Sequence, residues 1–171
     1  MNTFFIADPH FGHEPIIRFA NRPFASPEEM DRTIIENWNR TVSQDDEIFV
    51  LGDFAPGMNA EEVQRLIASL NGHKIFVLGN HDRNVPLVWW QNESGFQEVS
   101  RFPILLNEFF LLSHEPLYMN ATMPYLNIYG HVHANDIYRD VSPHGFCVSV
   151  ERINYTPISL AEIRERVKNV S

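Results

Sequence analysis

Five short apolar runs in the sequence are each followed, within two residues, by side chains that can bind a metal ion. These side chains are Asp8, His10, Asp53, Asn80, His114, His131 and His133. One zinc ion takes three or four protein ligands, so seven are typical of two ions that share a carboxylate. Nitrogen and oxygen donors without a thiolate suit manganese, iron or zinc. Two such ions, roughly 3.5–4 Å apart, can stabilise both the attacking and the leaving oxygen in a displacement at phosphorus.

The charge of such a centre also favours a phosphate substrate. Two divalent ions, two aspartates and a bridging hydroxide together leave about one positive charge at the site. The whole chain carries a formal net charge of −9, from 13 basic and 22 acidic side chains. We therefore expect the centre to attract small anions. The same net charge disfavours duplex DNA as a partner, because duplex binding depends mostly on lysine and arginine contacts to phosphates.

The spacing within the motifs favours convergence of these side chains. Asp8 and His10 are two residues apart, so in an extended segment both point to one face, and His131 and His133 have the same spacing. Glycine allows tight turns and a close approach of the backbone. It stands at three of the junctions, at Gly52, Gly79 and Gly130.

The elements that must position these residues alternate along the chain. Six β-prone runs predict strands at Phe4–Ile6, Ile48–Leu51, Ile75–Leu78, Phe109–Leu112, Leu126–Tyr129 and Phe146–Val150. Capping patterns predict helices that begin after Ser26, near Asn59 and after Ser159. Asn107 and Glu108 separate two apolar runs, which predicts a hairpin. Strands that alternate with helices indicate a layered α/β domain, whose ligands bind beyond the carboxyl ends of the strands.

Length and composition set the remaining limits. The 171 residues favour one domain, over residues 1–171. Cys147 is the single cysteine, which excludes an intrachain disulfide and any zinc site with several cysteines. The sequence has no run of 18 apolar residues and no recognisable secretory leader. We therefore expect a cytoplasmic protein without a membrane span.

Taken in order, these motifs resemble the five-block signature of the calcineurin-like metallophosphoesterases. The blocks are Asp8-x-His10, Gly52-Asp53, Gly79-Asn80-His81-Asp82, His114 and Gly130-His131-x-His133. The segments 8–13 and 21–24 further resemble small bacterial and phage phosphoesterases of this superfamily. One position departs from the signature, because Ala7 stands where glycine usually precedes the first aspartate.

The resemblance implies a fold and a set of ligands. The fold would be a four-layer α-β-β-α sandwich of two mixed sheets flanked by helices. Two divalent ions are implied, with Mn²⁺ favoured and Fe, Zn, Ni and Mg as alternatives. One ion would be held by Asp8, His10, Asp53 and His133. The other would be held by Asp53, Asn80, His114 and His131, so that Asp53 bridges the two. Many members of the superfamily are oligomers, so a homo-oligomer is a further expectation.

The resemblance also implies how the reaction proceeds. A hydroxide between the two ions would attack phosphorus in line, since bound water has a lowered pKa. His81 would be the general acid that protonates the leaving oxygen, and Asp82 would orient His81. Asp82 has the alternative interpretation of a helix cap. His13, Arg22 and Arg83 are candidates for contacts to the substrate phosphate, with solvated loop residues as the alternative.

Three functions remain for such a site. The first is hydrolysis of a small phosphodiester or phosphomonoester, in a bacterial or phage-infected cell. The second is a nuclease or a phosphodiesterase that acts on nucleotides or RNA ends with the same site. The third is a non-catalytic interaction module, which the retention of His81 and of every candidate ligand disfavours. Fold and motif do not fix the leaving group, so the substrate is open between a small phosphoester and a nucleotide.

Overall fold

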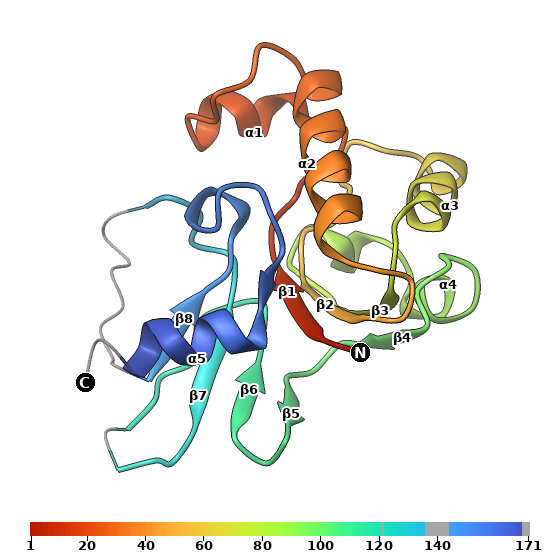
Figure 1. Ribbon diagram of the computed structural model, residues 1–171. Coiled ribbons are helices and arrows are strands. Elements are labelled where there is room, and N and C mark those ends of the chain that lie inside the picture. Colours follow the sequence, from red (N-terminus) through yellow and green to blue (C-terminus); the bar gives the residue numbers. More distant parts are fainter. Residues whose placement is uncertain (121, 136–143, 169–171) are drawn as a thin grey trace.

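Two β-sheets with flanking helices make up the protein in the computed structural model, which describes residues 1–120, 122–135 and 144–168 (Figure 1). The first sheet has five strands in the order β4-β3-β2-β1-β9. Its strands are β1 (Thr3–Ile6), β2 (Glu47–Leu51), β3 (His73–Val77), β4 (Glu98–Ser100) and β9 (Ile158–Ser159). Strands β1 to β4 are parallel and β9 is antiparallel to β1.

The second sheet has four strands in the order β5-β6-β7-β8. Its strands are β5 (Ile104–Leu106), β6 (Phe110–Leu112), β7 (Leu126–Tyr129) and β8 (Gly145–Cys147). β5 and β6 form the predicted hairpin, and the turn residues Asn107 and Glu108 both have positive φ. β6, β7 and β8 are parallel, so both sheets are mixed.

The helices begin where the capping patterns predict. The Ser26 hydroxyl accepts from Glu29 N at the start of α2 (Pro27–Thr41). Asn59 and Glu62 form a capping box that opens α3 (Ala60–Ser69). Two short helices, α1 (Glu14–Phe19) and α4 (Leu87–Asn92), and the C-terminal α5 (Leu160–Lys168) complete the set. In Figure 1, α2, α3 and α4 lie beside the five-stranded sheet, and α5 lies on the side of the four-stranded sheet.

One hydrophobic core joins the two sheets. It contains residues of β1, β2 and β3 together with residues of β6 and β7. A bridge between Ala7 and Ser149 also connects the end of β1 to the segment after β8. The α/β fold with two mixed sheets and flanking helices is thus confirmed. Within the described ranges, no helix is long and apolar enough to cross a membrane.

The structure differs from the sequence-based expectation at three strands and at helix α1. The run Phe146–Val150 ends as a strand at Cys147, and Val150 instead begins a 3₁₀ turn, Val150–Arg152. β4 and β9 have three and two residues, too few for an alternating pattern to be recognised. The six-residue α1 buries only Ile16, so it has no amphipathic period.

Candidate metal centre

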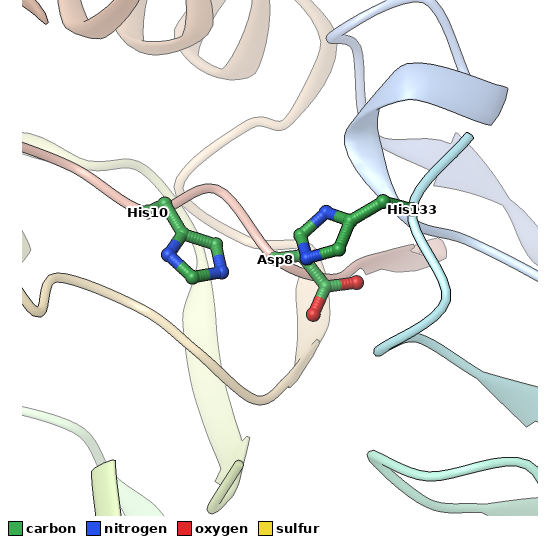
Figure 2. A group of neighbouring side chains, drawn as sticks. All are labelled: Asp8, His10 and His133. Carbon is green, nitrogen blue, oxygen red and sulfur yellow. The ribbon is translucent and has the colours of Figure 1, made fainter. Parts of the chain in front are cut away.

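The ends of five strands bring the seven predicted ligands together. Strands β1, β2, β3, β6 and β7 precede the segments that carry them. The ligand atoms of Asp8, His10 and His133 lie within 4.8 Å of one another. Figure 2 shows these three side chains gathered at the end of β1. We call them the first donor group.

The second donor group consists of Asn80, His114 and His131, and Asp53 lies beside it. The ligand atoms of Asp53, His114 and His131 also lie within 4.8 Å of one another. The Asn80 Oδ1 atom is 2.9 Å from His114 Nε2 and 3.0 Å from His131 Nδ1. Four nitrogen and oxygen atoms therefore face one small volume.

Asp53 stands between the two groups. Its Oδ2 atom is 3.5 Å from His10 Nε2 in the first group and 3.5 Å from His114 Nε2 in the second. A carboxylate oxygen at this place can serve both groups, as a bridging ligand does. Burial alone would raise the pKa of Asp53, but the neighbouring His10 and His114 outweigh it and lower that pKa to about 2. Asp53 is therefore ionised at neutral pH.

Buried donor atoms without a protein partner show that the residues fit a metal. Asp8 Oδ1 and His10 Nε2 are both buried, and neither has a hydrogen-bond partner in the structure. Unsatisfied buried polar atoms are costly, so a native protein needs a reason to keep them. Coordination of a divalent cation would satisfy both atoms. The donor set holds only nitrogen and oxygen, which fits Mn, Fe or Zn.

Hydrogen bonds orient the histidine rings toward the centre. His114 Nδ1 lies 3.0 Å from the Leu51 carbonyl oxygen, so Nδ1 donates and Nε2 keeps its lone pair. His133 Nδ1 lies 3.1 Å from Glu151 Oε1, so Nδ1 donates to this carboxylate and Nε2 keeps its lone pair. His10 Nδ1 lies 3.1 Å from His13 Nδ1. Metal-binding histidines are commonly held by such outer hydrogen bonds.

The backbone at the centre is strained. Five of the seven predicted ligands, Asp8, His10, Asp53, His131 and His133, have φ between 50° and 71°. This left-handed region costs a non-glycine residue on the order of 1–3 kcal/mol, and such strain is concentrated at functional sites. Their clustering here indicates that the loops are shaped for the centre rather than for local stability.

Gly79 must lack a side chain for Asp53 to take its position. A β-carbon at residue 79 would collide with Asp53 Oδ1 and with the Asp53 backbone nitrogen. We expect Gly79→Ala to displace this carboxylate, weaken metal binding and cost about 1–3 kcal/mol of folding free energy. Thermal unfolding and metal content of the purified variant test this, and a variant with full metal content would contradict it.

Ala7 fits in place of the usual glycine because the residue that faces it, Gly130, has no side chain. Ala7 is fully buried, and its methyl group faces Gly130, where a β-carbon would collide with it. Ala7 N donates to Val148 O and Ala7 O accepts from Val150 N, so the backbone runs as a strand. The departure from the signature therefore leaves Asp8 in position.

Arg22 lies behind the first donor group rather than in front of it. Its guanidinium is fully buried, and it donates to the carbonyl oxygens of Asp8 and Pro9 at 2.7 and 2.8 Å. It also contacts Glu151 Oε1 at 2.8 Å. The prediction that Arg22 contacts substrate is not supported by this geometry. Arg22 instead fixes the backbone on which Asp8 and His10 sit.

Glu151 and Ser149 are functional candidates that the sequence reasoning missed. The Ser149 hydroxyl donates to Asp8 Oδ2 at 2.6 Å. Glu151 accepts from Arg22 and faces His133, which together outweigh burial and lower the pKa of its carboxyl group. Burial alone would lower the pKa of His133, but Glu151 and Asp8 raise it. The signal was present, since a sixth apolar run, 146–150, is followed directly by Glu151.

Removing the charge of Glu151 should weaken the first donor group. We expect Glu151→Gln to lower the affinity for Mn²⁺ about 10- to 100-fold, because it no longer polarises His133. Calorimetric titration of the metal-free protein measures this. Glu61→Gln is a matched control, since Glu61 is an exposed carboxylate that pairs with Arg65 on α3, outside the site. Equal affinities of the Glu151→Gln variant and the unaltered protein would contradict this role.

Protons should compete with metal at this group. Burial raises the pKa of Asp8 to about 6 in the metal-free protein. Metal binding needs ionised Asp8, so lowering the pH from 7 to 5 should weaken Mn²⁺ binding at least about tenfold. His133, with its raised pKa, adds to this loss. Burial lowers the pKa of His10 to about 4, so His10 stays neutral over this range. Calorimetry at the two pH values tests this, and equal affinities would contradict it.

His81 lies at the exposed edge of the centre. Its side chain is 44% exposed, and its Nε2 atom is 4.0 Å from Asp53 Oδ2. Its ring meets the His10 ring edge-on, with 5.2 Å between centroids. The His13 ring is stacked on His10 and lies 5.9 Å from His81. The rings of His81 and His13 thus both lie beside His10 of the first donor group.

Asp82 does not orient His81. Its carboxylate is buried and accepts from three backbone N–H groups, of Asp53 at 2.6 Å, Phe54 at 3.1 Å and Gly79 at 2.8 Å. Burial raises its pKa to about 6. Instead of the predicted contact with the His81 imidazole, Asp82 makes hydrogen bonds that connect the loop carrying Asp53 to the loop carrying Asn80. Arg83 is half-exposed and pairs with both oxygens of Glu115, at 2.8 and 3.1 Å.

A cavity of about 800 Å³ opens over the centre. Asp53, Asn80, His81, His131 and His133 form part of its wall. The other lining residues are Phe19, Ala20, Asn21, Val132, Ala134 and Asn135. None of these is a lysine or an arginine. Its volume lies in the roughly 300–1,000 Å³ range of small-molecule sites.

Several known proteins are similar to this chain in sequence or in structure. An uncharacterised protein of Methanocaldococcus jannaschii is 38% identical over 164 residues, which are 92% of this chain and 86% of that protein. The gene 66 protein of Mycobacterium phage L5 is 34% identical over 88 residues, 50% of this chain and 42% of the phage protein. The crystal structure of a protein of unknown function from Aquifex aeolicus superposes with a TM-score of 0.75 at 30% identity, over 96% of this chain and 98% of that one.

The family itself follows from a match along almost the whole sequence. Residues 1–165 match the family of calcineurin-like phosphoesterases. The match includes both donor groups and His81. Members of this family typically use divalent metal ions, and the two donor groups agree with that chemistry. This chain therefore belongs to the calcineurin-like phosphoesterase family.

Proposed function

We propose that this chain hydrolyses small phosphodiesters or phosphomonoesters with two divalent ions, Mn²⁺ by preference. The observation that carries this proposal is the position of Asp53 Oδ2, 3.5 Å from His10 Nε2 of the first donor group and 3.5 Å from His114 Nε2 of the second. One carboxylate shared by two sets of donors is the arrangement that two-metal phosphoester hydrolysis needs.

Each donor group would hold one ion. Asp8, His10 and His133 would hold the first, Asn80, His114 and His131 the second, and Asp53 would contact both. When bound, the ions would neutralise the phosphoryl oxygens and lower the pKa of a water that attacks in line. Arg22, Ser149 and Asp82 keep the loops in place, so that these ligands need little rearrangement.

His81 would act as general acid. Its Nε2 atom faces Asp53 and its ring is accessible from the cavity, so a proton on Nε2 can pass to the leaving oxygen. With His10 Nε2 as a metal ligand, His10 Nδ1 would carry the hydrogen and donate it to His13 Nδ1, which lies 3.1 Å away. His13 would then fix the His10 tautomer instead of contacting the substrate phosphate.

The cavity favours a small substrate with few phosphates. Among the described residues, none that lines the cavity is a lysine or an arginine, so the bound ions would supply the positive charge for the reacting phosphoryl group. Duplex DNA would need many more cationic contacts. A nucleotide or an RNA end remains compatible with the same site. If the protein were a non-catalytic interaction module, the candidate metal ligands would be retained without a function.

Hydrolysis of model esters tests the proposal. The protein is stripped with a chelator, Mn²⁺ is restored, and bis-p-nitrophenyl phosphate is compared with p-nitrophenyl phosphate. We expect nitrophenol release that depends on Mn²⁺, and the faster ester identifies diesterase or monoesterase preference. Absence of release together with absence of bound metal would contradict the proposal and favour the interaction module.

A further inference from the structure

An exposed phenylalanine stands at the wall of the cavity over the metal centre. Phe19, the last residue of α1, is 82% exposed. It lines the cavity together with His133, and its ring meets the His133 ring edge-on, with 6.3 Å between centroids. The buried side of α1 is formed by Ile16, so Phe19 is not part of the core. Its ring lies beside a predicted ligand and faces solvent.

The segment that carries Phe19 is tied to the centre. Arg22 follows three residues later, and its N–H donates to Ile17 O at 2.8 Å. Its buried guanidinium donates to the Asp8 and Pro9 carbonyl oxygens behind the first donor group. These hydrogen bonds connect the backbone near Phe19 to the backbone of Asp8. An exposed aromatic ring at such a position can serve as a platform for a ligand.

The chemistry of the remaining wall narrows the ligand. Ala20, Val132 and Ala134 are small and apolar, and Asn21 is polar but uncharged. These four residues carry no charge, so this part of the described wall offers neither a cation for a second phosphate nor an anion for a basic group. It suits a flat, uncharged ring system with hydrogen-bonding edges, attached to the phosphoryl group. Nucleobases are flat and uncharged with hydrogen-bonding edges, and every base can stack on an aromatic side chain.

We propose that Phe19 is the stacking platform for the base of a nucleoside phosphoester, whose phosphoryl group lies at the metal centre. This rests on the proposed function, because the phosphoryl group is held by the same ions. Phe19 would then determine specificity without taking part in the bond-breaking step. Its removal should weaken binding of nucleotides and leave ligands without a base unaffected.

Binding of two matched ligands tests this. The phosphonate analogues of AMP and of ribose 5-phosphate, in which a C–P bond replaces the ester, differ only in the base and resist hydrolysis. Calorimetry with the Mn²⁺-loaded full chain gives both dissociation constants. We expect the AMP analogue to bind about 5- to 150-fold more tightly, the range that a stacked base provides. In Phe19→Ala this ratio should fall to near one, and in Phe19→Tyr it should be kept.

Phe102→Ala serves as the control, since Phe102 is 72% exposed and does not line the cavity. In Phe102→Ala, the ratio of the two dissociation constants should equal the ratio in the unaltered protein. Equal binding of both analogues, or an unchanged ratio in Phe19→Ala, would overturn the inference. A change in oligomeric state of Phe19→Ala with an unchanged ratio would assign Phe19 to a contact between copies instead.

The two proposals fail in different ways. If Mn²⁺-dependent hydrolysis of bis-p-nitrophenyl phosphate is present while the ratio is one, the base platform is wrong and the phosphoesterase stands. If the protein binds no metal and neither analogue, both are wrong.

Discussion

Replacement of His81 by alanine is expected to lower kcat by about 10²–10⁴ while both metal ions remain bound. The imidazole lies at the edge of the donor groups, with Nε2 4.0 Å from Asp53 Oδ2, and is 44% exposed. It is thus close enough to reach a leaving oxygen without holding the ions by itself. Steady-state rates together with metal content of the same preparation test this.

The size of the effect should depend on the leaving group. A general acid matters most when the leaving oxygen is strongly basic, so an alkyl ester should lose far more than a nitrophenyl ester. His73→Ala is the control, because His73 is an exposed histidine paired with Glu98 outside the site. Full activity of His81→Ala on an alkyl ester would show that the proton comes from elsewhere.

Replacement of Asp53 by asparagine should remove metal and activity together. Asp53 is the one carboxylate between the two donor groups, and the neighbouring histidines hold its pKa at about 2. An amide offers one neutral oxygen in place of a charged bridge. We expect activity to fall about 10³-fold or more, since a metal ion supplies several kcal/mol of stabilisation in the transition state.

Metal content and thermal unfolding check this second prediction. A ligand present at 100 times its dissociation constant stabilises a fold by about 2.7 kcal/mol. Mn²⁺ should therefore raise the Tm of the unaltered protein and leave that of Asp53→Asn nearly unchanged. Asp45→Asn, at an exposed position, should behave like the unaltered protein. Two ions per chain in Asp53→Asn would contradict the bridging role.

Much of the architecture was predictable because its signals are local. Asp8, Asp53 and Asn80 follow the ends of β1, β2 and β3 within three residues, and parallel strands end at one edge of a sheet. The helix starts at Ser26 and Asn59 are fixed by capping residues within four positions. The ligands could be predicted without knowledge of contacts between distant residues, since each of them follows one of five strands.

The supporting residues could not be assigned from local patterns. Arg22 and Glu151 are 129 positions apart in sequence and meet only in the folded chain. From the sequence, Arg22 looks like a solvated loop residue three positions after a helix, but in the fold it donates to the carbonyl oxygens of Asp8 and Pro9. Asp82 likewise follows a histidine in sequence, yet its partners are backbone N–H groups of other loops. These roles depend on tertiary contacts that periodicity does not encode.

The most direct test of the central claim is a crystal structure of the protein grown with Mn²⁺, with anomalous scattering used to locate the ions. We expect two peaks on either side of Asp53, roughly 3.5–4 Å apart. One should be surrounded by Asp8, His10 and His133, and the other by Asn80, His114 and His131. A single peak, or two peaks without a shared Asp53 oxygen, would contradict the dinuclear centre.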